Sequence, residues 1–416
     1  MNMIDQRVVV TGIGVISSIG IGKDNFWKAL EQGQSGIKPI TLFDTSTTQS
    51  KLAGEILDFR PEIILGEKGL RNLDRTTKLA LCASKLALDD SQFVVSEENT
   101  YDVGVVLGST MGSVWSISEF DKEALRNGPR SVNPALFPNT VINSPASQIS
   151  IKFGIKGFNT TISTGFTSSF EAIEYASSFI KAGRAKAVLV GGVEELCEQL
   201  FKGFYKLGFL SKSRGDKSGE VTSPFDRRRN GAILGEGSCV FLIEEINHAI
   251  NRGAKIYGEI AGMASAFDRA GYRGYNRTGD GLRRAILKAL DYSQVRPDEI
   301  QYVEASANST PDGDYAEFRA LSAIMNGQKN GFTASASKSM IGETFSASGA
   351  FQCAASLLAL NNSVIHPTIN YLEKDKKCEV DCAPNVPRYK NVNNVLVSCI
   401  SPMGQNSAML LSNQKR

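Results

Sequence analysis

Val8-Val9-Val10-Thr11-Gly12-Ile13-Gly14, at residues 8–14, is a run of β-branched residues that predicts a buried strand entering a glycine turn. Two later runs, at residues 102–108 and 187–192, are likewise almost continuous in apolar residues and close on glycine. Strands that are buried on both faces have this composition. Between these runs, residues 76–88 and 170–182 place apolar side chains every three to four positions, which is typical of helices. The alternation predicts an α/β fold in which helices cover a mixed sheet.

The second part of the chain has the same organisation. Strand-like and helix-like runs alternate along it, at residues 256–260, 281–290, 301–305, 315–325 and 394–399. A chain of 416 residues is long enough to bury a large core and to build one unit from two similar parts. We therefore predict two similarly built α/β halves, residues 1–250 and residues 251–416.

The composition argues against several classes of protein. The chain has 46 basic and 43 acidic residues, a formal charge of +3, and its basic residues are dispersed, which argues against nucleic-acid binding. No apolar run is long enough for a membrane span, and the N-terminus has no secretory signal pattern. The seven cysteines lack the spacing of a zinc site. We predict a cytoplasmic protein with reduced thiols that binds no membrane, no metal ion and no cofactor.

Two glycine motifs near the N-terminus are incomplete versions of nucleotide-binding motifs. Gly12-Ile13-Gly14 follows a strand, as in a dinucleotide-binding turn, but Ser17 occupies the position of the third glycine. Gly22-Lys23 matches part of a phosphate-binding loop, but Asp24 replaces the Ser or Thr that would hold magnesium. We therefore expect no nucleotide site.

Six blocks, in the same order along the chain, resemble the β-ketoacyl carrier-protein synthases, the thiolase-fold condensing enzymes of fatty-acid and polyketide assembly. The blocks lie at residues 8–17, 224–231, 234–237, 309–314, 338–342 and 367–370. Each block alone is a weak signal, but the ordered set covers essentially the whole chain. The resemblance implies a thiolase-like fold, in which two similar α/β halves form a layered α-β-α-β-α core.

The resemblance also implies that the chemical groups of these enzymes have been lost. Phe166 stands where the family has a nucleophilic cysteine at the start of a helix. Ser306 and Glu343 stand at the positions of the two histidines that assist decarboxylation and stabilise the enolate. Lys338 is retained, while residues 398–404 replace the family's glycine-rich gate. We therefore expect no catalytic residue in this chain.

Silent members of this family are best known as chain length factors, the ketosynthase beta subunits of type II polyketide synthases. The resemblance implies a heterodimer with an active ketosynthase, an acyl carrier protein as a second partner, and an elongation tunnel that the silent subunit shapes. The product would be a polyketide or a polyene. Chain length factors often carry glutamine in place of the cysteine, so Phe166 departs from their pattern.

Two other functions remain open at the level of the sequence. Glu343 or Ser306 could support a residual malonyl-carrier-protein decarboxylase or another acyl transfer, so whether the chain is itself an enzyme is undecided. A homodimeric ketosynthase-like scaffold would keep the fold without a synthetic partner. Turnover by the isolated subunit would indicate the first function, and a stable homodimer the second.

The resemblance places the wall of the tunnel on the helix that follows residue 110. The candidates are Met111, Ser113, Val114, Trp115, Ser116, Ile117 and Phe120. Helical spacing puts Ser113, Ser116 and Phe120 on one face. Met111, Val114, Trp115 and Ser118 share a neighbouring face, and the sequence favours neither face. Packing in the core is the alternative role for each of these residues.

Two segments are predicted to contact a partner subunit. By resemblance, Leu136 and Phe137 belong to a stretch that reaches across the family's dimer interface, with loop packing as the alternative. The strand before Phe166 corresponds to the family's pairing strand across the two-fold axis. Its residues are Asn159, Thr160, Thr161, Ile162 and Ser163.

Two structural expectations follow from the lost catalytic positions. A buried ammonium needs a counter-charge, and the glutamate that usually serves this lysine in the family is replaced by Gln352. We therefore predict that Glu343 pairs with Lys338, the alternative being a solvent-facing Glu343. We also predict that the ring of Phe166 fills the vacated acyl pocket.

Overall fold

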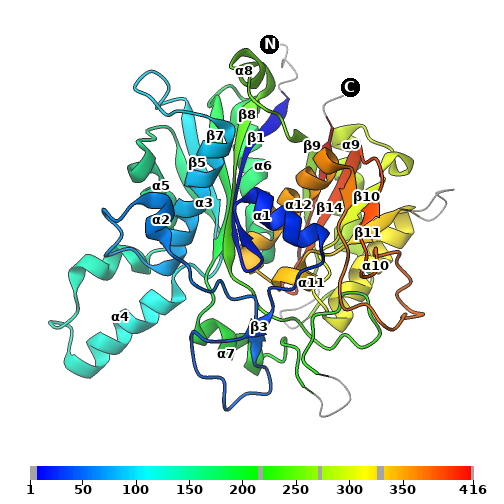
Figure 1. Cartoon of the computed structure of the whole chain (residues 1–416), viewed down its shortest axis with the longest axis horizontal. Coiled ribbons are helices and arrows are strands. Elements are labelled where there is room, and N and C mark those ends of the chain that lie inside the picture. The colour runs from blue at the N-terminus through cyan, green and yellow to red at the C-terminus, as the bar shows by residue number, and fades with distance from the viewer. Residues whose placement is uncertain (1–6, 214–218, 270–273, 326–331, 414–416) are drawn as a thin grey trace.

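The computed structural model describes residues 7–213, 219–269, 274–325 and 332–413, and within them the main strands form one 11-stranded mixed sheet (Figure 1). From one edge to the other these strands are β11 (Thr333–Ser335), β10 (Tyr302–Glu304), β14 (Asn394–Ile400), β15 (Gln405–Ser412), β9 (Gly258–Phe267), β1 (Val8–Ser17), β8 (Gly237–Glu245), β7 (Ala187–Glu194), β5 (Val103–Gly108) and β6 (Asn159–Ile162), with β2 (Gly20–Ile21) paired to β1.

The order of the strands repeats on the two sides of the sheet. Outward from the centre, β1, β8, β7, β5 and β6 are joined by two antiparallel and then two parallel pairings. Strands β9, β15, β14, β10 and β11 follow with the same sequence of pairings. The two wings meet where β1 pairs with β9 at Val9 and Val10. This repeat confirms the predicted fold of two similar α/β halves.

Helices cover and separate the two wings, as Figure 1 shows. Helix α3 (Arg75–Ser91) packs on β1 and β8, while α9 (Asp280–Ser293) packs on β9 and β15. Helices α6 (Ser168–Lys181) and α12 (Ser348–Asn362) contact each other and the strands on either side of them. The layers therefore follow the predicted α-β-α-β-α order.

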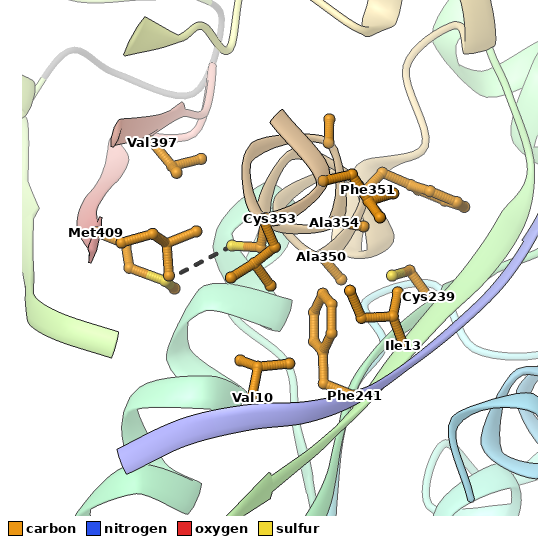
Figure 2. Packing of buried hydrophobic residues seen from close by; sticks show 14 of the residues in the cluster. Val10, Ile13, Cys239, Phe241, Ala350, Phe351, Cys353, Ala354, Val397 and Met409 are labelled. Carbon is orange, nitrogen blue, oxygen red and sulfur yellow. Dashed lines mark hydrogen bonds between the residues drawn. The ribbon is translucent and has the colours of Figure 1, made fainter. Parts of the chain in front are cut away.

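Helix α12 forms the centre of the core because it is apolar on nearly every side. All its residues from Ser348 to Leu360 are buried. Figure 2 shows Phe351 and Cys353 of this helix close to residues of β1 and β8, with Met409 of β15 on another side. The Cys353 thiol lies 3.6 Å from the sulfur of Met409.

Two predicted features of the strands are wrong in detail. The glycines of the first run form no turn, because β1 continues through them to Ser17. A Cβ at Gly12 would lie 2.3 Å from the carbonyl oxygen of Ala87, and one at Gly14 would lie 1.9 Å from that of Ala83. These glycines therefore let α3 approach the strand closely. The strand expected at residues 256–260 begins at Gly258 and continues to Phe267.

The remaining elements surround this core. The helices are α1 (Lys23–Glu31), α2 (Pro61–Leu65), α4 (Val114–Asn127), α5 (Ser144–Phe153), α7 (Glu198–Lys206), α8 (Ile246–Asn251), α10 (Pro311–Met325) and α11 (Lys338–Ile341). The 3-10 turns are η1 (Pro134–Thr140), η2 (Gly165–Thr167), η3 (Pro297–Glu299) and η4 (Phe345–Ala347). Two short ribbons pair β3 (Lys38–Pro39) with β4 (Leu52–Ala53), and β12 (Val364–Ile365) with β13 (Arg388–Tyr389).

Helix α4 projects from the body of the molecule at the lower left of Figure 1. None of its residues is buried, and its main contacts are with η1 and α7. We call α4 and η1 together the arm, which spans residues 114–140. In the described ranges, no helix combines the length and the apolar character needed to cross a membrane.

Candidate functional site

Phe166 lies in η2, the single turn of 3-10 helix between β6 and α6. Gly165, at φ +71°, makes the turn sharp, and the Thr110 hydroxyl donates to the carbonyl oxygen of Gly165 at 2.6 Å. Residue 166 is thus held beside the N-terminus of α6, where the positive end of the helix dipole would lower the pKa of a cysteine. A phenyl group gains nothing from this field and cannot carry an acyl chain.

The ring of Phe166 is wholly buried among other aromatic rings. Its centroid lies 5.2 Å from that of Phe345, 5.9 Å from Phe209 and 6.3 Å from Phe204. The contacts with Phe345 and Phe209 are edge-to-face, which is a favourable geometry for aromatic pairs. We call these four residues the phenylalanine cluster, and they fill the interior at residue 166.

The predicted ion pair between Lys338 and Glu343 is present. The Lys338 ammonium lies 2.9 Å from Oε2 of Glu343, and their side chains are 1% and 0% exposed. Burial opposes the charged form of Lys338, but the charge and the hydrogen bond of Glu343, together with other acidic groups nearby, outweigh it, so the pKa of Lys338 is raised. The alternative of a solvent-facing Glu343 is therefore wrong.

The carboxylate of Glu343 is fully engaged with hydrogen-bond donors. Besides Lys338, Asn308 Nδ2 donates to Oε2 at 2.8 Å. The backbone N–H of Phe345 and the Ser348 hydroxyl donate to Oε1 at 3.0 and 2.5 Å. Both carboxylate oxygens of Glu343 are therefore held by donors of the surrounding fold.

Ser306 lies beside this ion pair. Its hydroxyl oxygen accepts hydrogen bonds from Lys338 Nζ at 3.3 Å and from the backbone N–H of Ile400 at 3.1 Å. Phe345 donates to Glu343 through its backbone and contacts Phe166 through its ring. The structure therefore brings Phe166, Ser306, Lys338 and Glu343 into one buried region.

Neither histidine of the chain lies among these four residues. His366 Nε2 lies 2.8 Å from Glu304 and Nδ1 lies 2.9 Å from the Ser335 hydroxyl, in a buried polar network. His248 is on α8 and contacts Glu244 at 2.7 Å. Cys399 donates to the carbonyl oxygen of Phe166 at 3.4 Å, but burial raises the pKa of its thiol to about 12. The region thus offers no thiolate at neutral pH and no imidazole.

A surface groove of about 480 Å³ leads to the phenylalanine cluster. Its walls include Tyr275, Thr310 and Met403, and also Phe204 and Phe209 of the cluster. Phe166 lies behind these two rings, so access from the surface stops at the cluster. Across the described ranges, no group of three His, Cys, Asp or Glu side chains is placed to hold a metal ion.

The candidates for the tunnel wall fall into three environments. Met111 and Val114 pack against the apolar residues around Phe166, and Ser113 is buried with them. Ile117 is 38% exposed. Trp115, Ser116 and Phe120 line a groove of about 600 Å³ beside α4, which we call the arm groove. The predicted grouping of Trp115 with Met111 and Val114 is therefore wrong, because Trp115 lines the same groove as Ser116 and Phe120.

The candidates for partner contacts lie at the surface. Phe137 and Leu136 on η1 are 56% and 41% exposed, although the Phe137 ring also lies 6.0 Å from that of Phe120. Strand β6 is the edge strand of the sheet. Asn159 and Ser163 are exposed there, and Thr160, Thr161 and Ile162 are half-buried. Sequence reasoning missed other exposed apolar residues nearby in the chain, at Leu125, Val141, Ile142 and Ile151.

A duplicated α-β-α-β-α fold, with a sharp turn before the central helix of its first half, defines the class of thiolase-fold condensing enzymes. Two sequence profiles match in this order: the β-ketoacyl synthase N-terminal domain at residues 5–249 and the β-ketoacyl synthase C-terminal domain at residues 257–372. The chain belongs to the β-ketoacyl synthase family.

Similar proteins include both fatty-acid and polyketide members of this family. The 3-oxoacyl-[acyl-carrier-protein] synthase 2 of Coxiella burnetii is 32% identical over 98% of both chains. The tetracenomycin polyketide synthase ketoacyl synthase alpha subunit of Streptomyces glaucescens is 32% identical over 99% of this chain and 98% of that protein. The solved structure of the ishigamide ketosynthase/chain length factor matches with a TM-score of 0.90 at 30% identity, covering 98% of this chain and 99% of that chain.

Glu317 on α10 makes the stability of this region depend on pH. Its Oε1 accepts hydrogen bonds from the backbone of Ser306 and the hydroxyl of Ser398, while Oε2 has no partner in the described ranges. Burial raises the pKa of Glu317 from 4.5 to about 7. The folded state thus binds a proton more tightly than the unfolded chain, so stability is lost as pH rises from 4.5 to 7.

Replacing Glu317 by glutamine is expected to remove about 3 kcal/mol of this pH-dependent loss. The measurement is guanidinium denaturation of both proteins at pH 5 and pH 8. Other buried carboxyl groups with raised pKa values also make stability fall as pH rises. The informative quantity is therefore how much the change in unfolding free energy from pH 5 to pH 8 differs between the two proteins. The exposed Glu67→Gln variant is the control, and its stability should change with pH as that of the unmodified protein does. Equal slopes for the Glu317→Gln variant and the unmodified protein would contradict this prediction.

Proposed function

We propose that this chain is a non-catalytic chain length factor, which pairs with an active ketosynthase and shapes the elongation tunnel of a type II polyketide synthase. The observation that carries the proposal is the buried arrangement of Phe166, Lys338 and Glu343. At the position of the nucleophile a ring fills the interior. At one imidazole position a carboxylate neutralises the retained lysine, so these side chains stabilise the fold instead of reacting.

The chemistry of condensation explains why such a site is silent. The acyl group must be held on a thiolate, and the negative charge that develops on the enolate must be stabilised by a positive or hydrogen-bonding group. Glu343 is an anion at the position where the family places a donor, and its lone pairs are already occupied. Its charge would oppose the enolate.

The surface of the arm supports a protein partner. Large exposed apolar side chains and the unpaired backbone groups of an edge strand are features of protein interaction sites. Leu125 is 86% exposed and Phe137 56% exposed on the arm, and β6 forms the sheet edge. Two similar structures are a ketosynthase/chain length factor and a type II ketosynthase in complex with its acyl-carrier protein, at 30% and 27% identity. We infer an active ketosynthase and a carrier protein as the partners.

The arm groove gives the proposed subunit a means to set product length. Trp115 and Phe120 are bulky, and both line this groove. A growing chain stops when its next unit would overlap filled volume, because close-packed side chains yield little space. Product length would then depend on the shape of the arm rather than on chemistry in this chain.

Co-expression with any intact ketosynthase that is encoded beside this chain tests the proposal. We expect a one-to-one complex by native mass spectrometry, and products of defined length when carrier protein and malonyl extender are supplied. The isolated chain should not turn over malonyl-carrier protein. A stable homodimer without association would favour the scaffold function, and turnover by the isolated chain would favour the decarboxylase.

A Phe166→Cys variant provides a matched control for the silent state. It restores the thiol, but Ser306 and Glu343 still lack imidazoles, so the isolated variant should not condense acyl groups. Condensation by this variant at the rate of an active ketosynthase would contradict the proposal, because the remaining site would then be competent.

A further inference from the structure

Helix α4 begins without a cap of its own. Its N-cap residue is Ser113, a residue type that usually accepts a hydrogen bond from the first turn. Here the Ser113 hydroxyl makes no such bond, and its buried oxygen has no partner in the described ranges. The first N–H groups of a helix need acceptors from elsewhere when the cap residue supplies none.

Glu195 supplies the acceptor from another part of the fold. It directly follows β7, its side chain is nearly fully buried, and its Oε1 accepts a hydrogen bond from the backbone N–H of Trp115 at 3.3 Å. Trp115 is the second residue of α4. A carboxyl group 80 residues away in sequence therefore caps the helix.

Glu194 holds the segment before the helix in the same way. Its carboxylate accepts hydrogen bonds from the backbone N–H groups of Thr110, Met111 and Gly112 at 3.1 to 3.3 Å. The hydroxyl of Ser346 on η4 also donates to it at 2.9 Å. Two successive glutamates at the end of β7 thus fix the stem of the arm, residues 109–115.

This stem matters because packing does little to orient α4. The helix has no buried residue, so few side-chain contacts resist a change in its direction. Trp115, at the capped turn, lines both the arm groove and a neighbouring groove that Glu195 also lines. The position of the Trp115 side chain, and with it the shape of both grooves, therefore depends on the cap.

We propose that Glu195 is a positioning residue that fixes the direction of the arm, and thereby the depth of the arm groove and the length of the product. The product-length part of this inference rests on the proposed function. Glu195 touches no reacting atom, and it acts through the backbone of α4.

The protonation of Glu195 suggests a conservative replacement. Burial, together with the charge of nearby Asp74, raises the pKa of Glu195 to about 8. The group is therefore largely neutral at pH 7, and a glutamine carbonyl can accept the same hydrogen bond. Methionine has a similar length without this acceptor, and the buried setting tolerates its apolar side chain.

The test compares three variants in the complex with the ketosynthase: Glu195→Met, Glu195→Gln and Glu198→Gln. Glu198 lines the same neighbouring groove but pairs with Lys202 on its own helix, so its variant is the matched control. Hydrogen exchange of peptides from residues 109–127 reports the arm, and mass spectrometry reports product length. Glu195→Leu serves as a second apolar variant if Glu195→Met does not fold.

We expect at least tenfold faster exchange in residues 109–127 of the Glu195→Met protein, and a broader distribution of product lengths. The Glu195→Gln and Glu198→Gln proteins should match the unmodified protein in both measurements. Unchanged exchange in the Glu195→Met protein, or faster exchange with an unchanged distribution of lengths, would overturn the inference.

The same experiment separates this inference from the proposed function. If the unmodified chain does not associate with a ketosynthase, the proposed function and the effect on product length both fail. Exchange in the isolated chain then still decides whether Glu195 caps α4. If the unmodified complex makes products of defined length and the Glu195→Met complex makes the same products, only the positioning role of Glu195 fails.

Discussion

The Phe166→Ala protein is expected to unfold with a free energy about 3 to 5 kcal/mol lower than that of the unmodified protein. The Phe166 ring is wholly buried and contacts three other rings, which come from η4, α7 and the loop after α7. Removing it leaves a cavity that these rings cannot fill without leaving their own positions. Guanidinium denaturation at pH 7 measures the effect.

Two further variants show whether the loss comes from the cavity. Phe166→Leu retains most of the apolar volume and should cost clearly less than Phe166→Ala. Phe267→Ala removes a ring that is 63% exposed, and its effect should stay within about 1 kcal/mol. A Phe166→Ala protein as stable as the unmodified one would show that the ring does not support the fold.

The Glu343→Gln protein is expected to lose about 3 to 5 kcal/mol of stability at pH 7, because the buried ammonium of Lys338 then has no counter-charge. Glutamine has nearly the same size as glutamate but keeps only one acceptor oxygen, so the variant removes the counter-charge together with an acceptor for the donors around residue 343. Chemical denaturation at pH 7 again provides the measurement. A surface pair serves as the control: Glu379→Gln, beside Lys374 at 3.3 Å, should cost less than about 1 kcal/mol.

A double variant separates the charge from the packing. Lys338→Met together with Glu343→Gln removes the unpaired ammonium, so it should recover part of the stability that Glu343→Gln alone loses. If the single variant were as stable as the unmodified protein, the ion pair would contribute no net stability. If the double variant were the less stable of the two, the loss would come from packing rather than from charge.

Much of the fold could be predicted from local patterns. Apolar runs such as residues 103–108 and 187–192 form central strands as expected, because they are buried on both faces. The glycines of β1 were wrongly predicted to form a turn. They are needed because α3, some 70 residues away in sequence, packs against the strand at these positions. Strand β8 was not predicted, although the run Cys239 to Ile243 carries the same apolar signal.

The site could be predicted only where one short block contains both partners. Lys338 and Glu343 are five residues apart, and the need to neutralise a buried lysine was enough to pair them. The cluster around Phe166 joins residues from three separate segments, so no local pattern marks it. Glu194 and Glu195 were missed for the same reason, since their partners lie on the stem of the arm. Two adjacent acidic residues at the end of an apolar strand were the signal available.

The duplication of the fold has a consequence for how this chain can evolve. Turns η2 and η4 precede equivalent central helices in the two halves, and their side chains Phe166 and Phe345 meet ring to edge. A substitution at either turn is therefore constrained by the other half. A cysteine at residue 166 would leave part of the volume of the Phe166 ring unfilled beside Phe345. It would also lie near the carboxylate of Glu343, which Phe345 of η4 and Ser348 of α12 hold in place. If the chain is silent as proposed, a return to catalysis would require coordinated substitutions in both halves.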